Sequence, residues 1–321
     1  MVATPYTLSL YLMYMPEDAL EKTFFCVYDQ IKDDITCKLS HVRTFYSIAN
    51  ADKKTFWRFR LSSIFRYFFI RFTDIYAMDF LDFTPQLIGH SKYTCIEDGA
   101  GNFTYGQYVD VFKPFSLPRT WWGFKRRLQH GPVYGKTMGT NRQCVNRLIT
   151  STEDITSPLL QGKKFTLVDL HAEWQNASET KKNNIKYVFN ITESIFLQAK
   201  ECKTILLTQP LQTDGMTTEE MIELYRKYIN KYIREGVVIK PHPAEQMDYG
   251  KIFPQAVFLK TRVPMQLLSV MGITFDRALT PYSTAVSALP STTEIEWIGL
   301  ECNELIAKKT KLVMQSMTKN K

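Results

Sequence analysis

Two adjacent carboxylates follow a predicted strand. Residues 92–96 (KYTCI) favour a short strand, and Glu97, Asp98 and Gly99 come directly after it. Carboxylates just beyond the carboxyl end of a strand lie where open α/β sheets bind ligands. Because neighbouring negative charges repel each other, one of the two pKa values is expected to rise, which would give a base usable near neutral pH. A solvated turn in which Gly99 takes a positive φ is the alternative interpretation.

A histidine stands between two prolines at the end of a second predicted strand. Residues 237–240 (VVIK) predict the strand, and Pro241, His242 and Pro243 follow. The prolines restrict the backbone on both sides of His242, whose imidazole could then donate to a phosphate or protonate a leaving oxygen. A structural histidine in a tight turn is the alternative. A metal role is less favoured than either, since none of the 5 histidines has an acidic or cysteine partner at ligand spacing.

A third polar group opens a predicted helix. Tyr282, Ser283 and Thr284 come after a predicted strand at residues 278–280. Hydroxyl groups and free backbone N–H groups at a helix N-terminus form a site that suits phosphate. Ser283 could instead serve as the helix N-cap, which is the commoner use of serine at this position.

The elements that would position these groups alternate between strand and helix. Thr217 and Glu220 have the spacing of a capping box, and Gly236 suits the end of the helix that they begin. This alternation predicts an α/β protein with parallel sheets covered by helices on both faces. The expected strands are 165–170, 204–208, 237–240, 256–259 and 278–280; the expected helices are 217–236, 264–271, one from 283 and a last one from 294 to about 314.

Length and composition agree with two folded domains. At about 150 residues per domain, 321 residues suggest two, and the polar segment 151–164 is the best candidate linker. The net charge of +8 favours anionic partners. The 6 cysteines have no paired spacing and indicate reduced thiols in a cytoplasmic protein. The uncharged stretch 1–16 is shorter than a membrane span and lacks a basic leader, so neither export nor spanning is expected.

Residues 56–72 (FWRFRLSSIFRYFFIRF) interleave aromatic and basic side chains. A buried aromatic helix with outward arginines is one interpretation. A helix at the surface of an anionic membrane is another, which would place the protein peripherally at the inner face of the cell membrane. Stacking on nucleic acid comes third, because no nucleic-acid-binding signature accompanies the segment. We therefore expect no nucleic-acid partner.

Missing motifs narrow the enzyme class. A G-x-G-x-x-G fingerprint after a strand is absent, which weakens the dehydrogenase interpretation, and a P-loop is absent too. The sequence also lacks a D-x-D triplet, the element that commonly holds the divalent ion of diphosphate-sugar donors. Two α/β domains would still suit several ligand-binding classes.

The order of the three polar groups resembles a known enzyme group. An acidic D/E-D/E-G element, an H-P element after a later strand and an S-S/T element resemble the bacterial sialyltransferases. Together with residues 2–10 (VATPYTLSL), they are most similar to glycosyltransferase family 52, whose members sialylate lipooligosaccharide or capsule-type glycans.

The resemblance implies a GT-B fold with two Rossmann-like domains whose parallel sheets face a central cleft. Residues 1–155 would form the acceptor-side domain and residues 156–321 the domain that binds the donor, cytidine monophosphate (CMP)-sialic acid. The reaction would be an inverting transfer of sialic acid to a galactoside or a sialoside, without a metal and without a further cofactor. A homodimer is left open.

The resemblance also implies a role for each site residue. Glu97 would be the general base, Asp98 would orient it or share its charge, and His242 would stabilise or protonate the phosphate of departing CMP. The nucleotide contacts would be Lys240, His242, Pro243, Gln266, Ser283 and Thr284. Gln266 replaces an acidic residue that the family often has at the ribose. The strand that normally precedes the T-P-Y segment is almost missing.

Two other classes stay open. One is a GT-B glycosyltransferase that uses a nucleotide-diphosphate sugar, and the other is a non-catalytic glycan-binding or membrane-associated protein. A melting temperature raised preferentially by uridine or guanosine nucleotides would favour the first class. A melting temperature that no nucleotide changes would favour the second.

Overall fold

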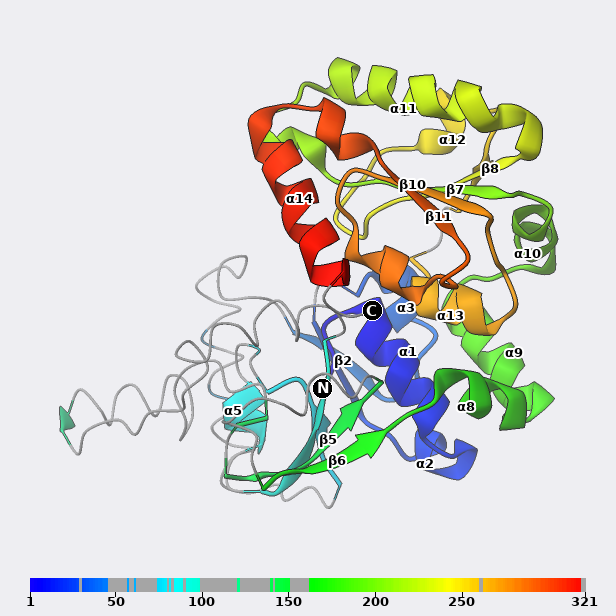
Figure 1. The fold of residues 1–321 in the computed structure, drawn as a ribbon. Helices are drawn as coiled ribbons and strands as arrows, with labels where there is room; N and C mark the ends of the chain where they lie inside the picture. The colour runs from blue at the N-terminus through cyan, green and yellow to red at the C-terminus, as the bar shows by residue number, and fades with distance from the viewer. Residues whose placement is uncertain are drawn as a thin grey trace. The chain divides into compact units, whose positions relative to one another are not determined.

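The computed structural model describes residues 1–28, 31–45, 57, 61, 74–79, 81, 84–88, 91–98, 120–121, 139–140, 142–150, 162–259 and 262–318. They belong to two compact units, residues 1–176 and 177–321 (Figure 1). The domain boundary expected between residues 155 and 156 lies outside the described residues, as do Gly99 and most of the segment 56–72. No helix in the described part of the chain has both the length and the apolar character that a bilayer crossing requires.

The first unit contains a two-stranded and a four-stranded parallel sheet. Strands β1 (Phe25–Tyr28) and β2 (Val42–Phe45) form the smaller sheet. The larger one has the order β3-β4-β5-β6, from β3 (Tyr76–Ala77), β4 (Tyr93–Ile96), β5 (Cys144–Ile149) and β6 (Lys164–Leu167). Strand β6 corresponds to the strand expected over residues 165–170, and it pairs with β5 in the first unit.

Residues 1–3 join these two sheets. Val2 makes backbone hydrogen bonds of 3.0 and 3.1 Å with β1, and the Met1 carbonyl accepts a backbone hydrogen bond of 3.1 Å from the residue after β3. The combined order is therefore β2, β1, residues 1–3, β3, β4, β5, β6, which is the doubly wound order with its switch point between residues 1–3 and β3. The first strand, expected to be almost missing, is reduced to this short segment.

Helix α1 (Pro5–Tyr14) leads away from residues 1–3. Thr4 is its N-cap and forms a capping box with Thr7, while Pro5 occupies the first turn, where a missing N–H costs nothing. Most of its side chains are buried, as expected for a helix that is apolar on all sides. Further helices among the described residues of this unit are α2 (Glu17–Glu21), α3 (Asp33–Thr36), α5 (Thr84–Ile88) and α8 (Leu170–Asn176).

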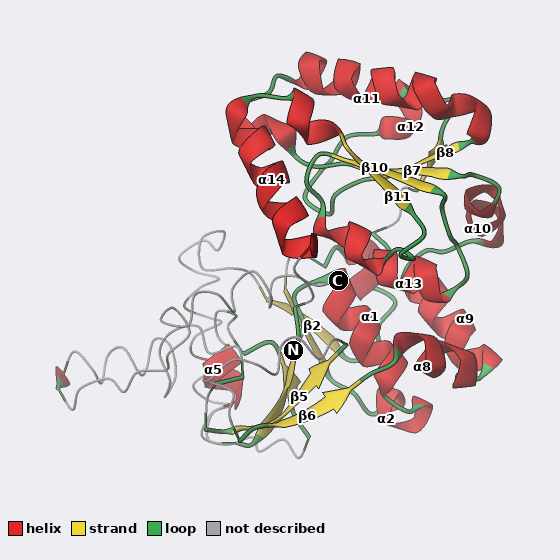
Figure 2. Ribbon diagram, viewed as in Figure 1, coloured by secondary structure: helices red, strands yellow, loops and turns green. Residues whose placement is uncertain are grey.

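The second unit has one five-stranded parallel sheet in the order β11-β10-β7-β8-β9, shown in yellow in Figure 2. Its strands are β7 (Thr204–Leu207), β8 (Val237–Lys240), β9 (Val257–Phe258), β10 (Arg277–Thr280) and β11 (Glu294–Trp297). The chain order reverses between β7 and β10, so this is the switch point of the sheet. The helix expected to begin at residue 294 is wrong at its start, because residues 294–297 pair with β10 and the helix α14 covers Glu304–Thr318.

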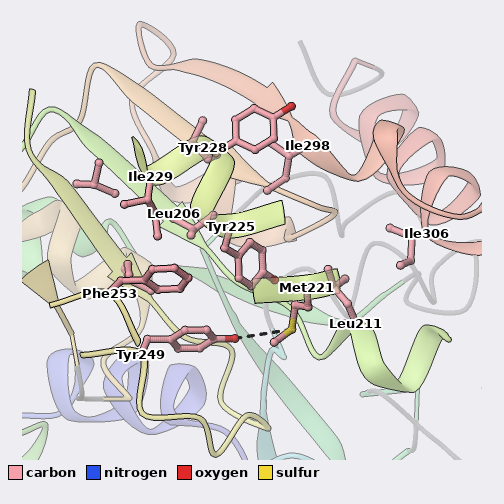
Figure 3. Close-up of a cluster of buried hydrophobic side chains, with 13 residues drawn as sticks. Leu206, Leu211, Met221, Tyr225, Tyr228, Ile229, Tyr249, Phe253, Ile298 and Ile306 are labelled. Carbon is pink, nitrogen blue, oxygen red and sulfur yellow. Dashed lines mark hydrogen bonds between the residues drawn. The ribbon is translucent and has the colours of Figure 1, made fainter. Parts of the chain in front are cut away.

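Helices cover both faces of this sheet. Helix α11 (Thr218–Tyr232) begins with the predicted Thr217–Glu220 capping box and lies with α12 (Tyr249–Ile252) on one face, while α13 (Met265–Val270) lies on the other (Figure 1). Figure 3 shows the aromatic core under α11, where the rings of Tyr249 and Phe253 stack with centroids 6.4 Å apart. The remaining helices are α9 (Glu179–Val188), α10 (Glu193–Lys200) and the 3₁₀ turns η4 (Leu211–Asp214), η5 (Ile233–Glu235), η6 (Thr284–Ala288) and η7 (Ile298–Glu301).

A glycine in η7 allows α14 to approach the end of β10. A Cβ atom on Gly299 would lie 2.4 Å from Thr310 Oγ1 and 2.6 Å from the Pro281 carbonyl oxygen. We expect Gly299→Ala to lower the free energy of unfolding by about 1–3 kcal/mol, because α14 must move away. Urea denaturation of the intact chain measures the change. Gly250→Ala, whose nearest neighbour is a side-chain atom at 3.0 Å, should cost less, and equal losses would contradict this explanation.

Candidate active site

The end of β4 places Glu97 in a network of hydroxyl groups. The residue is 2% exposed, and its backbone N–H donates to the Leu148 carbonyl of β5 at 3.1 Å. Its Oε1 accepts a hydrogen bond from the Thr150 hydroxyl at 2.5 Å and another from the Tyr6 hydroxyl. The first turn of α1 and the ends of β4 and β5 therefore hold one carboxylate oxygen in place.

Asp98 has a different environment from its neighbour. The pKa of Asp98 is raised to about 6, chiefly by burial. A contact of 3.5 Å from the Thr4 hydroxyl acts in the opposite direction, and the charge of Glu97 adds a smaller rise. The predicted rise therefore occurs, but burial contributes more than repulsion does. A carboxylate with this pKa changes its protonation state close to neutral pH, as a general base must.

In the second unit, β8 ends with a buried lysine. Lys240 is 8% exposed, and within the described residues no carboxylate forms an ion pair with it. Burial alone lowers the pKa of Lys240 to about 8. An ammonium group that is kept from water and has no ion-pair partner in the described part of the chain is a favourable partner for an anionic ligand.

The His242 imidazole has one nitrogen already engaged. The Ala244 N–H donates to Nδ1 at 3.2 Å, so the proton of the neutral ring belongs on Nε2. Burial lowers the pKa of His242, and the charge of Lys240 lowers it further. Near pH 7 the ring is consequently neutral and offers Nε2–H as a hydrogen-bond donor. Pro243 lies in the turn after His242 and contributes its restricted backbone, having no polar side-chain atom.

The remaining expected nucleotide contacts lie at the start of η6 and in α13. Ser283 is the N-cap of η6, where its hydroxyl accepts a hydrogen bond from the Ala285 N–H at 3.3 Å. The expected helix is thus a short 3₁₀ turn, but the Ser283 hydroxyl can still donate. Thr284 is half-buried in η6, and Gln266 is half-buried in the first turn of α13.

The parallel sheet brings part of this set to a single edge. Lys240 is the last residue of β8 and His242 follows it, Ser283 follows the end of β10, and both strands neighbour β7. In the first unit, Glu97 and Asp98 lie at the corresponding edge of the sheet. The sequence analysis missed Tyr6, in the first turn of α1, and Thr150, directly after β5. In the part of the chain that the structure describes, no three His, Cys, Asp or Glu side chains gather where they could share a metal ion.

A family model accounts for most of this chain. The model of glycosyltransferase family 52 matches residues 79–302, which include both carboxylates, the His-Pro turn and the η6 residues. The chain belongs to glycosyltransferase family 52. It is therefore a glycosyltransferase, and the resemblance seen in the sequence is confirmed.

A relative and several solved structures are similar to this family 52 glycosyltransferase. An uncharacterized protein of Haemophilus influenzae is 30% identical over 239 residues, covering 74% of this chain and 72% of that protein. The GT-B domain of a sialyltransferase from Photobacterium damselae has a TM-score of 0.62 at 15% identity, over 98% of this chain and 94% of that one.

Two other structures have the same fold. A 2,6-sialyltransferase of Photobacterium sp. JT-ISH-224, in a ternary complex with CMP and lactose, has a TM-score of 0.64 at 11% identity and covers 98% of this chain and 74% of its own. An α/β-galactoside α-2,3-sialyltransferase of Photobacterium phosphoreum has a TM-score of 0.57 at 13% identity, with coverages of 98% and 94%. The predicted GT-B fold of the family 52 chain is confirmed.

The hydroxyl network around Glu97 can be tested by its effect on stability. Tyr6→Phe removes a donor from a buried carboxylate, so the free energy of unfolding should fall by about 1–3 kcal/mol. Chemical denaturation measures this change. Tyr14→Phe, on the same helix, is the matched control. The Tyr14 ring packs against the Tyr76 ring with centroids 6.4 Å apart and is kept in this variant, so the free energy of unfolding should change little. If both variants were as stable as the wild type, the hydroxyl of Tyr6 would not support Glu97.

Proposed function

We propose that this family 52 glycosyltransferase is an inverting sialyltransferase that moves sialic acid from CMP-sialic acid to a galactoside of a surface glycan, with a sialoside as the alternative acceptor. One observation carries the proposal. A neutral imidazole, whose Nε2–H has no hydrogen-bond partner among the described residues, lies beside the buried ammonium of Lys240 at the edge where α/β sheets bind nucleotides. The similar fold that was crystallised with CMP and lactose supports the same substrates.

The donor side suits a nucleotide with a single phosphate. As the bond between the sialic acid C2 and the phosphate oxygen breaks, negative charge accumulates on the phosphate. Lys240 supplies a positive charge, and His242, Ser283 and Thr284 supply N–H and O–H donors, as preorganised electrostatic stabilisation requires. Gln266 would contact the ribose through its amide. This set neutralises one phosphate without a metal, and we propose metal-independent catalysis.

The acceptor side needs a group that takes a proton. The acceptor hydroxyl attacks C2 from the face opposite the phosphate, a new C–O bond forms, and the proton moves to a carboxylate. The resemblance assigns this role to Glu97, but the structure favours Asp98. The pKa of Asp98 is about 6, whereas Oε1 of Glu97 is already occupied by two hydroxyl donors. We propose that Glu97 anchors the loop and that Asp98 accepts the proton.

Mass spectrometry of transfer products tests the proposal. Purified protein is incubated with CMP-sialic acid and lactose, and the expected product is sialyllactose. Asp98→Asn and His242→Ala should each reduce transfer by about 10²-fold or more, while Glu223→Gln on the exposed face of α11 should not. Product formation from a uridine- or guanosine-diphosphate sugar, with none from CMP-sialic acid, would establish the competing GT-B activity instead.

The pH dependence of kcat/KM should be bell-shaped. Asp98 acts as the anion, so the rate falls as the pH drops below its pKa of about 6. Lys240 acts as the cation, so the rate falls as the pH rises above its pKa of about 8. Lys240→Arg keeps the charge at high pH and should move the basic limb upward. An unmoved basic limb in that variant would show that Lys240 does not cause it.

Peripheral contact with an anionic membrane and a homodimer stay predictions.

A further inference from the structure

One carboxylate connects three elements beneath the His-Pro turn. Glu245 Oε2 accepts a hydrogen bond from the His242 backbone N–H at 2.8 Å and another from the Thr208 hydroxyl. Its Oε1 accepts one from the Tyr249 hydroxyl at 2.6 Å. The ends of β7 and β8 and the first turn of α12 therefore meet at this side chain.

Glu245 also closes the turn that contains the histidine. Its backbone N–H donates to the His242 carbonyl at 2.9 Å, while its carboxylate receives the His242 N–H. The two contacts form a reciprocal ring across the turn, and Pro243 sits at the second position, where proline is favoured. In this closed turn the Ala244 N–H points at Nδ1 of the imidazole, at 3.2 Å.

We infer that Glu245 is a positioning residue: its carboxylate holds the turn 242–245 closed, and the closed turn fixes His242 in the tautomer that presents Nε2–H to an incoming phosphate. The tautomer part of this inference stands on the turn alone. The phosphate part rests on the proposed function and adds to it a group that never touches the substrate.

The contacts around Glu245 distinguish this role from simple support of the fold. The Thr208 hydroxyl also accepts the His242 N–H, at 3.2 Å, so this partly buried donor keeps a partner when the carboxylate is replaced. The Tyr249 ring packs against Tyr225 and Phe253 in the core (Figure 3), independently of its hydroxyl. Loss of the carboxylate should therefore loosen the turn without unfolding the second unit.

Glu245→Gln tests the inference, because the amide keeps one acceptor oxygen but presents an NH₂ group in place of the other. In ¹⁵N-labelled full-length protein, the wild type should show His242 protonated on Nε2, and the variant should show a mixture of both tautomers. In the transfer assay with CMP-sialic acid and lactose, kcat should fall at least about tenfold while KM for CMP-sialic acid changes less. The reason is that a misaligned Nε2–H of His242 weakens a hydrogen bond that matters most in the transition state.

Glu223→Gln on α11 is the matched control, since that glutamate forms an ion pair with Arg226 on the surface. It should leave both the tautomer and kcat unchanged. If Glu245→Gln does not fold, Glu245→Asp provides the same comparison with a shortened carboxylate. An unchanged tautomer in the Glu245 variant overturns the inference. If the wild type transfers no sialic acid, the proposed function fails, while the tautomer measurement on the free protein still decides the role of Glu245.

Discussion

Parallel strand pairing is the constraint on which the second unit depends. Because β8 and β10 both run parallel to β7, their carboxyl ends meet at one edge, and residues distant in sequence arrive there together. This places His242 and Ser283 on either side of the switch point. In the first unit, the same rule brings Glu97, directly after β4, next to Thr150, directly after β5, and to the start of α1. Each half of the candidate site thus follows from sheet topology.

Burial then gives the polar groups their chemical character. Asp98 and Lys240 have pKa values moved toward neutrality from opposite directions, and in both cases burial is the first cause. Groups with such shifts are concentrated at functional sites, because the cost of keeping a charge from water is offset when a ligand supplies its partner. The lowered pKa of His242 follows the same logic, and it makes the ring a hydrogen-bond donor at pH 7.

Local patterns in the sequence were sufficient for several regular elements of the second unit. The Thr217–Glu220 capping box and the strand at residues 237–240 depend on neighbours a few residues away, so periodicity and capping rules predict them. The strand β11 was mistaken for a helix because its partner β10 lies elsewhere in the chain, and a short amphipathic run does not reveal such a partner.

The residues of the candidate site also fall into two groups, those that local sequence patterns reveal and those that only distant contacts bring in. The two carboxylates and His242 could be recognised because each follows a strand end. Their partners could not: Tyr6 reaches Glu97 from 91 positions away, and Thr208 reaches Glu245 from 37 positions away. Glu245 itself had a local signal, since an acidic residue three positions after a histidine can close a turn, but the signal is weak without knowledge of the turn.

Titration of the intact protein with CMP, followed through the ¹⁵N and proton resonances of the His242 imidazole, tests the central claim most directly. If His242 and Lys240 hold the phosphate of the donor nucleotide, saturation with CMP moves the Nε2–H resonance downfield, and Lys240→Met weakens the affinity without removing the tautomer. A resonance that does not respond to CMP but responds to a uridine or guanosine diphosphate would contradict the account.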